Sequence, residues 1–304
     1  MAMQRATEND QPAVDEDDGI VIDLRDETLA RQALYERLVS TSPSGELVID
    51  LRDEVLDALL ELAPTGRTIL PSANPSGRPP ELQEGLSVVV IDDGPEWDKA
   101  EEFVYDTYVK LGYTEENRDH QVAELQKYRT RSRFHAAVKD DGAIVGTTRA
   151  IFGEFHELPV GQFTRIDFAD EEPMCELSSI VVDPTERSKG VIEHLYREGW
   201  ADGVRNNAAT IAGLGERWMI DGFRLYYCMP FVPIGIPEWY MGGEVIPFTM
   251  ATSTKAMDEV HRNNPEFWMW NLEALEAAVI EARGFTKYFD DPHAVAANRA
   301  RAEA

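Results

Sequence analysis

The sequence predicts an α/β domain, with a sheet flanked by helices, between an acidic N-terminal extension and a helical C-terminal extension. Three observations support this prediction. Apolar β-branched runs alternate with stretches of helical periodicity over residues 85–255. Residues 1–84 contain 18 acidic residues, seven arginines and no lysine. Residues 256–304 have a mostly helical pattern and are rich in alanine.

The charge balance limits the classes of partner. The 304 residues include 56 acidic and 29 basic side chains, which gives a formal net charge of −27. A surface of this sign repels nucleic acid and anionic lipid, so we expect no nucleic-acid partner. The excess acid also keeps a protein soluble, including in a salty cell. Any anionic ligand therefore needs a locally positive site.

Neither a membrane span nor a metal site is expected. The sequence has no early basic-then-apolar stretch and no run of about 20 apolar residues. The six histidines show no metal-ligand spacing. The only two cysteines, Cys175 and Cys228, lack it too, and two free thiols fit a reducing compartment. We therefore expect a cytoplasmic protein.

A seven-residue repeat marks the N-terminal extension. The residues at 21–27, Val-Ile-Asp-Leu-Arg-Asp-Glu, recur identically at 48–54. Two interpretations stay open: a duplicated docking motif that makes the protein a homo-oligomer, or two copies of one packing unit that cover the main domain. Residues 64–85 contain five prolines and are typical of a linker, whereas residues 1–18 are expected to be disordered.

The order of elements in the central domain follows from periodicity and turn signals. We expect helices over 95–111, 115–127, 189–205 and 216–222. The expected strands include a hairpin that turns at an Asp-Gly pair, and they cover 87–91, 134–138, 143–151, 174–182, 210–213 and parts of 223–251. We expect the aromatic and Ala-rich stretch 267–282 to pack on this domain.

The turn after the strand at 174–182 predicts an anion site. The first turn of a helix has unpaired N–H groups and the positive end of the helix dipole. Gly190 lets the backbone approach a phosphate closely, and Arg187 and Lys189 supply positive charge. We therefore expect a phosphate-bearing ligand at this turn.

This strand, turn and helix resemble the signature of the GNAT superfamily of N-acyltransferases. The signature is an apolar strand, a Val-x-Pro-like step and then Arg/Gln-x-x-Gly-x-Gly/Ala at the start of a helix, and the chain has Val182-Asp183-Pro184 and then 187–192. The resemblance implies a mixed, mostly antiparallel sheet. It also implies that a pantetheine thioester is bound by Val181, Val182, Arg187, Ser188, Lys189, Gly190, Val191 and Ile192.

Other stretches resemble the long-chain branch of GNATs, which includes autoinducer synthases and N-acyl amino acid synthases. Glu176-Leu177-Ser178 is similar to the Glu-Leu-Ser stretch on the fourth strand of that branch, with Ser179 where arginine is usual. Residues 105–113 resemble its first helix, and 222–243 resemble its C-terminal strands. Ile192 replaces the last small residue of the signature, which either narrows the phosphate cradle or favours a carrier-protein donor.

Glu176 is the candidate catalytic base. Amide formation from a thioester needs a neutral amine, so a base must remove a proton. Burial between apolar strand residues raises a carboxyl pKa toward neutrality. The alternatives are that Glu176 points to solvent or pairs with an arginine. The resemblance implies that the N–H groups of Val181 and Val182 stabilise the oxyanion. The usual tyrosine acid is Trp218 here, and Tyr226 or Tyr227 either replaces it or packs in the core.

Two further groups of residues have open roles. Arg129, Arg131 and Arg133 either meet the donor's 3′-phosphate or a carrier protein, or form a solvated face that balances nearby acids. An apolar set either lines an acyl tunnel or packs in the core, and consists of Phe231, Ile234, Ile236, Trp239 and Tyr240. Cys175 is expected to be buried and inert.

The expected function is N-acyl transfer from acyl-CoA or an acyl-carrier protein to the amine of an amino acid or another small amine. One alternative is a non-catalytic interaction or assembly protein with the GNAT fold, which the duplicated motif, Trp218 and Ile192 favour. The other is an enzyme that modifies lysines in basic protein tails, which the acidic surface would suit.

Overall fold

The computed structural model describes residues 81–163, 165, 173–187 and 189–289, together with the backbone of 39–41 and 47–49. The chain divides into two compact units, Met1–Leu62 and Ala63–Ala304. In the first unit, β1 (Val39–Thr41) pairs antiparallel with β2 (Leu47–Ile49), which includes the start of the second repeat copy. The first copy, residues 64–80 of the expected linker and residues 290–304 lie outside the described residues.

The second unit is built on one mixed sheet. Its described residues form eight strands in the order β3-β4-β5-β6-β7-β10-β8, and β9 pairs separately with β10. All neighbouring strands are antiparallel except β6 and β7, which are parallel. The prediction of a mixed, mostly antiparallel sheet is therefore confirmed. The bounds are β3 Leu86–Ile91, β4 Ser132–Lys139, β5 Ile144–Gly153, β6 Met174–Val182, β7 Thr210–Gly215, β8 Val232–Pro233, β9 Glu238–Tyr240 and β10 Gly243–Ala251.

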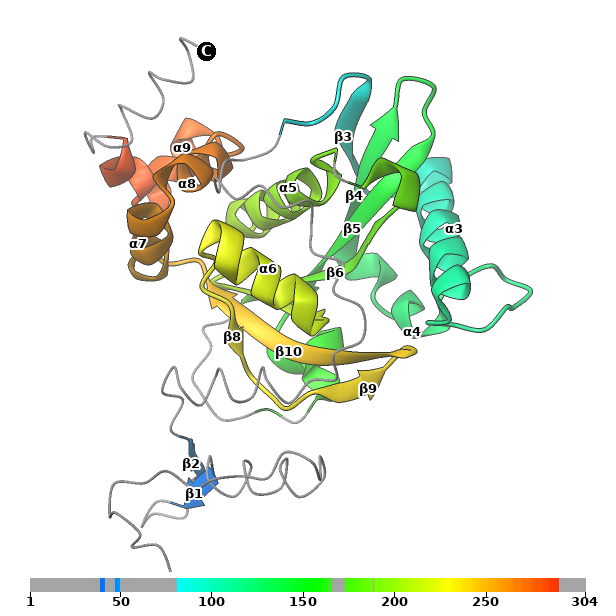
Figure 1. Cartoon of the computed structure of the whole chain (residues 1–304), viewed down its shortest axis with the longest axis horizontal. Helices are drawn as coiled ribbons and strands as arrows, with labels where there is room; N and C mark the ends of the chain where they lie inside the picture. Colours follow the sequence, from blue (N-terminus) through cyan, green and yellow to red (C-terminus); the bar gives the residue numbers. More distant parts are fainter. Residues whose placement is uncertain are drawn as a thin grey trace, which may run out of the picture. The chain divides into compact units, whose positions relative to one another are not determined.

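Helices cover both faces of this sheet (Figure 1). On one face, α3 (Gly94–Leu111) and α4 (Ala123–Gln126) enclose an apolar core with Trp97, Val104 and Phe134. On the other face, α5 (Val191–Arg205) packs Val191 and Leu195 against Val145. Helix α6 (Arg217–Tyr227) follows β7 in the chain. This arrangement places the N-terminus of α5 next to the end of β6.

The C-terminal helices pack on α5, as the aromatic residues predict. They are α7 (Thr254–Asn263), α8 (Pro265–Leu272) and α9 (Ala277–Ala282), followed by the 3-10 turn Phe285–Tyr288. The ring centroids of Trp200 and Trp268 are 5.4 Å apart, and those of Tyr227 and Phe267 are 4.4 Å apart. Aromatic contacts of this kind contribute about 0.5–1.5 kcal/mol each beyond area burial.

Two of the expected helices have different bounds. The expected helix at 115–127 is wrong except for α4, because the hydrogen bonds of Asn117 hold the residues before α4 in a loop. Its backbone N–H donates to the Tyr105 hydroxyl at 2.7 Å, and its side-chain amide donates to the Gln121 carbonyl at 2.9 Å. The helix expected to end at 222 continues to 227, because Phe223 and Tyr227 pack against each other one turn apart, with ring centroids 5.6 Å apart.

Strands β6 and β7 part soon after they meet. Their parallel ladder joins Met174, Cys175 and Glu176 to the first three residues of β7, and no pairing follows. The neighbouring β5–β6 ladder is irregular next to this point, where Ser179 has a φ of 49°. The two strands therefore leave a gap in the sheet beyond Glu176.

The β9–β10 hairpin closes one side of this gap through a tight turn. Met241 and Gly242 both have positive φ, at 47° and 78°. A Cβ on Gly242 would overlap the carbonyl oxygen of Gly112, at the C-terminus of α3, and would lie 2.9 Å from the Cα of Tyr113. Only glycine therefore allows the hairpin to lie against α3 in this way.

Replacing Gly242 with alanine is expected to lower the free energy of unfolding by roughly 2–5 kcal/mol, because left-handed strain adds to backbone overlap. Gly142→Ala is the matched control, since Gly142 has a φ of 83° but faces open space. It is expected to cost only about 1–2 kcal/mol. Urea denaturation measures both values, and equal losses would contradict the proposed contact.

Candidate active site

A cleft of about 680 Å³ opens where β6 and β7 part. We call it the β6–β7 cleft. The end of α3, the turn at 183–187, the first turn of α5 and the β9–β10 hairpin complete its walls. Its lining includes Phe103, Tyr108, Lys110, Tyr113, Leu125, Glu176, Leu177, Val181, Val182, Arg187, Val191, Ile192, Glu193, Leu214, Glu216, Tyr240 and Met241.

Glu176 lies in this cleft where the β6–β7 pairing ends. Its side chain is 1% exposed, and its Oε2 accepts a hydrogen bond from the Val160 N–H at 2.8 Å. Burial raises the pKa of Glu176 to about 8, against the lowering effect of that hydrogen bond. The side chain therefore neither points to solvent nor forms an ion pair with an arginine. Near neutral pH it exchanges a proton readily, as a general base requires.

The backbone of β6 presents Val182, rather than Val181, to the gap. The N–H of Asp183 donates to the Val145 carbonyl at 2.8 Å, and Val181 is in register with Thr147 on β5. Successive residues of a strand direct their peptide groups to opposite sides. The peptide groups of Asp183 and Val181 thus face β5, and the N–H of Val182 faces away from it. Val182 is therefore the better placed oxyanion donor.

The predicted anion turn lies at one end of the cleft. Gly190 has a φ of 77°, so α5 begins at Val191 and not at 189 as expected. The first N–H groups of α5 have no acceptor within the helix. Arg187, Val191 and Ile192 line the cleft, whereas Gly190 does not, and Ser188 lies outside the described residues.

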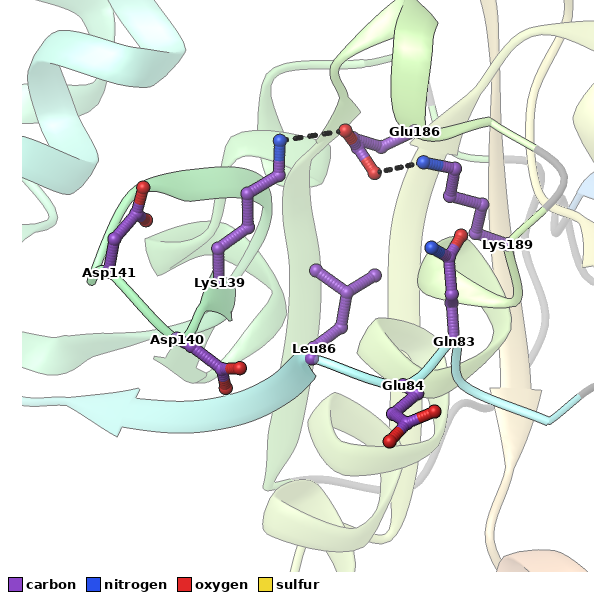
Figure 2. Close-up of a pocket in the computed structure, with 9 residues that line it drawn as sticks. Gln83, Glu84, Leu86, Lys139, Asp140, Asp141, Glu186 and Lys189 are labelled. Atoms are coloured by element: carbon purple, nitrogen blue, oxygen red, sulfur yellow. Dashed lines mark hydrogen bonds and ion pairs between the residues drawn. The ribbon is translucent and has the colours of Figure 1, made fainter.

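Lys189 faces a different cavity, of about 370 Å³, and is bonded to Glu186 (Figure 2). The Lys189 Nζ donates to Glu186 Oε2 at 2.7 Å, and the Lys139 Nζ donates to Oε1 of the same carboxylate at 2.9 Å. These two hydrogen bonds lower the pKa of Glu186 and keep it ionised. Positive charge in the β6–β7 cleft therefore comes from Arg187 and Lys110.

Three other polar groups of the cleft are not predicted from sequence as polar groups of a site, and Tyr240 is expected from sequence only to line an acyl tunnel or to pack in the core. The Tyr113 hydroxyl donates to Glu216 Oε1. Glu193 is buried in the first turn of α5 and accepts a hydrogen bond from the Tyr227 hydroxyl at 3.0 Å. The Tyr240 hydroxyl is buried and has no hydrogen-bond partner among the described residues. Helical periodicity and strand patterns give no signal for these contacts, because each joins distant segments.

The arginines just before and at the start of β4 form ion pairs outside the cleft. Arg129 pairs with Glu101 at 3.0 Å and Arg131 with Glu157 at 2.9 Å. Arg133 pairs with Asp92 and Asp202, each at 3.1 Å. The interpretation that this row balances nearby acids fits these contacts, and no donor contact is needed to explain it.

The other open roles also follow from burial. Of the apolar set, Tyr240 alone lines the cleft, whereas Phe231 and Ile234 are core residues and Trp239 is 77% exposed. An acyl tunnel built from that set is therefore not present. Tyr227 packs on Phe267 and bonds to Glu193, and the side chains of Trp218 and Tyr226 lie outside the described residues. Burial raises the pKa of the Cys175 thiol, as expected of an inert cysteine.

Comparison with known proteins gives a family match for the central domain. The family model described as "Acetyltransferase (GNAT) family" matches residues 97–212. This part of the chain is therefore similar to GNAT acetyltransferases. The GNAT match includes Glu176 and the whole anion turn, and it ends before Tyr240. No curated protein sequence matches the chain.

Several solved structures are similar to this chain at low identity. TofI, in a ternary complex with an inhibitor and MTA, is 19% identical over 57% of this chain and 96% of its own, with a TM-score of 0.42. BjaI, a CoA-dependent acyl-homoserine lactone synthase, is 14% identical over 58% of this chain and 90% of its own, with a TM-score of 0.44. FeeM, an N-acyl amino acid synthase from uncultured soil microbes, is 14% identical over 57% of this chain and 95% of its own, with a TM-score of 0.44.

Membrane and metal features were also sought in the part of the chain that the structure describes. No helix there has the length and apolar character needed to cross a bilayer. No three His, Cys, Asp or Glu side chains in those same residues come together as a metal-binding group.

The buried carboxyl of the central domain makes stability depend on pH. Because the folded-state pKa of Glu176 is about 8 and the ordinary value is 4.5, the folded protein holds this proton more tightly. The stabilising contribution is complete below pH 4.5 and is lost as pH rises through 8. Glu176→Gln should therefore gain stability relative to the wild type between pH 5 and pH 9, on the order of 3 kcal/mol.

Urea denaturation of both proteins at several pH values measures this difference. Glu124→Gln is the control, because Glu124 is exposed and should leave the pH dependence unchanged. Parallel stability curves for the wild type and Glu176→Gln would contradict the raised pKa.

Proposed function

We propose that the chain is an N-acyltransferase that moves an acyl group from acyl-CoA or an acyl-carrier protein to the amine of an amino acid or another small amine. One observation carries this proposal: a single cleft joins the N-terminus of α5 to the buried Glu176 through the gap between β6 and β7. Such a cleft has room for a thioester arm along β6, with its phosphate at one end and its carbonyl near Glu176 at the other.

The donor is held by groups that recognise phosphate and amide. Both candidate donors carry phosphopantetheine, whose phosphate would accept hydrogen bonds from the first N–H groups of α5 and from Arg187. The pantetheine amides would pair with the β6 edge that β7 leaves free. Ile192 at this turn leaves the choice between CoA and a carrier protein to experiment.

The chemistry follows from the same geometry. The ionised Glu176 carboxylate takes a proton from the acceptor ammonium, and the neutral amine attacks the thioester carbonyl, forming a C–N bond. The Val182 N–H stabilises the resulting oxyanion. The C–S bond then breaks, and the thiolate takes the remaining extra proton from the new amide nitrogen as it leaves. Since a thiol has a pKa of about 8.5, this step needs no dedicated acid.

A donor titration followed by a thiol-release assay tests the proposal. Calorimetry with CoA and with a phosphopantetheinylated carrier protein measures donor binding, and release of free thiol is then followed with and without an amine pool. Amine-dependent release is expected. Donor binding without amine-dependent release would instead support the non-catalytic interaction protein. Absence of both donor binding and thiol release would reject the cleft as a donor site.

Glu176→Gln should lower kcat about 10²–10⁴-fold, because the amide cannot accept a proton. The wild-type rate relative to the variant should rise about tenfold from pH 7 to pH 9, since the carboxyl, with a pKa of about 8, ionises over that range. The ratio cancels the titration of the amine itself. A flat ratio would exclude Glu176 as the base.

Arg187→Ala should raise the KM of the donor about tenfold, since it removes a cation from the cleft wall. Lys189→Ala is the matched control and should change KM little, because the ammonium is bonded to Glu186 at 2.7 Å and faces the other cavity. Steady-state kinetics with varied donor measures both. A larger effect at Lys189 would reverse the assignment of the phosphate contact.

A further inference from the structure

Tyr240 places an unsatisfied hydroxyl in the β6–β7 cleft. The hydroxyl oxygen is buried and has no hydrogen-bond partner among the described residues, although the side chain lines the cleft together with Glu176. Nearly all buried polar groups in proteins are paired, because an unpaired one loses its hydrogen bonds to water without replacement. A bound molecule that pairs with this hydroxyl would recover that loss.

The position of Tyr240 is fixed by its surroundings. Its ring makes an edge-on contact with Phe163, with centroids 5.4 Å apart. The next two residues form the tight turn that lies against Gly112 at the end of α3. The hydroxyl therefore cannot easily turn away to find another partner, and it acts as a preorganised group of the site.

In the part of the chain that the structure describes, no cation is among the groups that act on Glu176 or on Tyr240. Burial raises the pKa of Glu176, opposed only by the N–H of Val160, and burial followed by the negative charge of Glu176 raises the pKa of Tyr240. The cations among the residues that line the cleft are Lys110 and Arg187. Lys110 acts on Asp183 in the anion turn, and Arg187 acts on Tyr113, which lies against the β9–β10 turn at Gly242.

Arg149 is a buried cation on the same face of the sheet, and it does not line the cleft. Its guanidinium lies 3.9 Å from the Glu101 carboxylate and about 5 Å from the rings of Trp97 and Phe134. The walls beside Glu176 and Tyr240 also include the apolar Phe103, Leu125 and Met241 and the phenol of Tyr108. Burial raises the pKa of Tyr108, and the Ser179 hydroxyl and the charge of Arg149 oppose that rise. A carboxylate placed here would be a buried charge without a counter-ion.

We propose that this end of the cleft takes a primary amine with an apolar body and no carboxylate, and that the Tyr240 hydroxyl binds the amine beside Glu176. The ammonium of such an acceptor pairs with the Glu176 carboxylate, and its second N–H donates to the Tyr240 oxygen. This inference rests on the proposed acyl transfer and narrows its acceptor from any small amine to a decarboxylated one.

Matched acceptors test the inference, with the full chain and a saturating acyl donor. Phenethylamine is compared with phenylalanine, and isopentylamine with leucine, by thiol release and by mass spectrometry of the amide. Each amine should exceed its amino acid in kcat/KM by on the order of 100-fold, because the carboxylate would be buried unpaired. Equal or faster acylation of the amino acids would overturn the acceptor class while leaving acyl transfer intact.

Tyr240→Phe tests the hydroxyl. The variant should raise the KM of the amine about tenfold, with donor affinity unchanged and a melting temperature no lower than that of the wild type, because the lost hydroxyl had no partner. Tyr288→Phe is the control: its hydroxyl is bonded to the Thr254 carbonyl at 2.9 Å and to Asp258 at 2.8 Å, so it should lower the melting temperature and spare the kinetics.

Three results would overturn the role of Tyr240 or its premise. An unchanged KM for the amine would remove the hydroxyl from the acceptor site. A lower melting temperature with a matching loss of kcat would assign it a structural role. Thiol release that stays at the hydrolysis background with every amine would reject the acyl transfer itself, and this result is separable from the first two.

Discussion

The short parallel ladder between β6 and β7 is the constraint on which the rest of the site depends. It joins Met174, Cys175 and Glu176 to Thr210–Ala212 and then ends. As far as Glu176, β6 and β7 are paired, and the continuous sheet buries the Glu176 side chain. Beyond Glu176, the facing peptide groups of β6 and β7 are not paired with each other. The same ladder thus creates both the low-dielectric environment that perturbs the carboxyl and the gap that a linear ligand can enter.

The charge distribution divides the cleft into two ends with different chemistry. Glu186 pairs with the ammonium groups of both Lys139 and Lys189, so these two cations do not add positive charge to the cleft. Arg187 is left to the anion turn, where the N–H groups of α5 add their partial positive charge. The other end has a carboxyl, a phenol and apolar walls. An elongated molecule with an anionic head and an uncharged reacting group fits this polarity.

The GNAT match of the central domain and the geometry of the cleft support the same reaction class by independent routes. The family match covers the strand, turn and helix that would hold the donor. The acceptor end depends on Tyr240, which lies beyond the match and is set by the β9–β10 hairpin. Acyl transfer is therefore a proposal about the part of the fold that the family match covers, whereas acceptor choice is a proposal about residues beyond that match.

Local sequence by itself determined the bounds of β6 and the hairpin at the Asp-Gly pair, because periodicity and turn chemistry act within a few residues. It also indicated a buried Glu176. Tertiary structure decided the rest: Asn117 bonds to Tyr105 and prevents a helix, Glu186 diverts Lys189, and the hairpin places Tyr240 beside Glu176. These outcomes depend on contacts between distant segments, and a local pattern carries no information about which partners will meet.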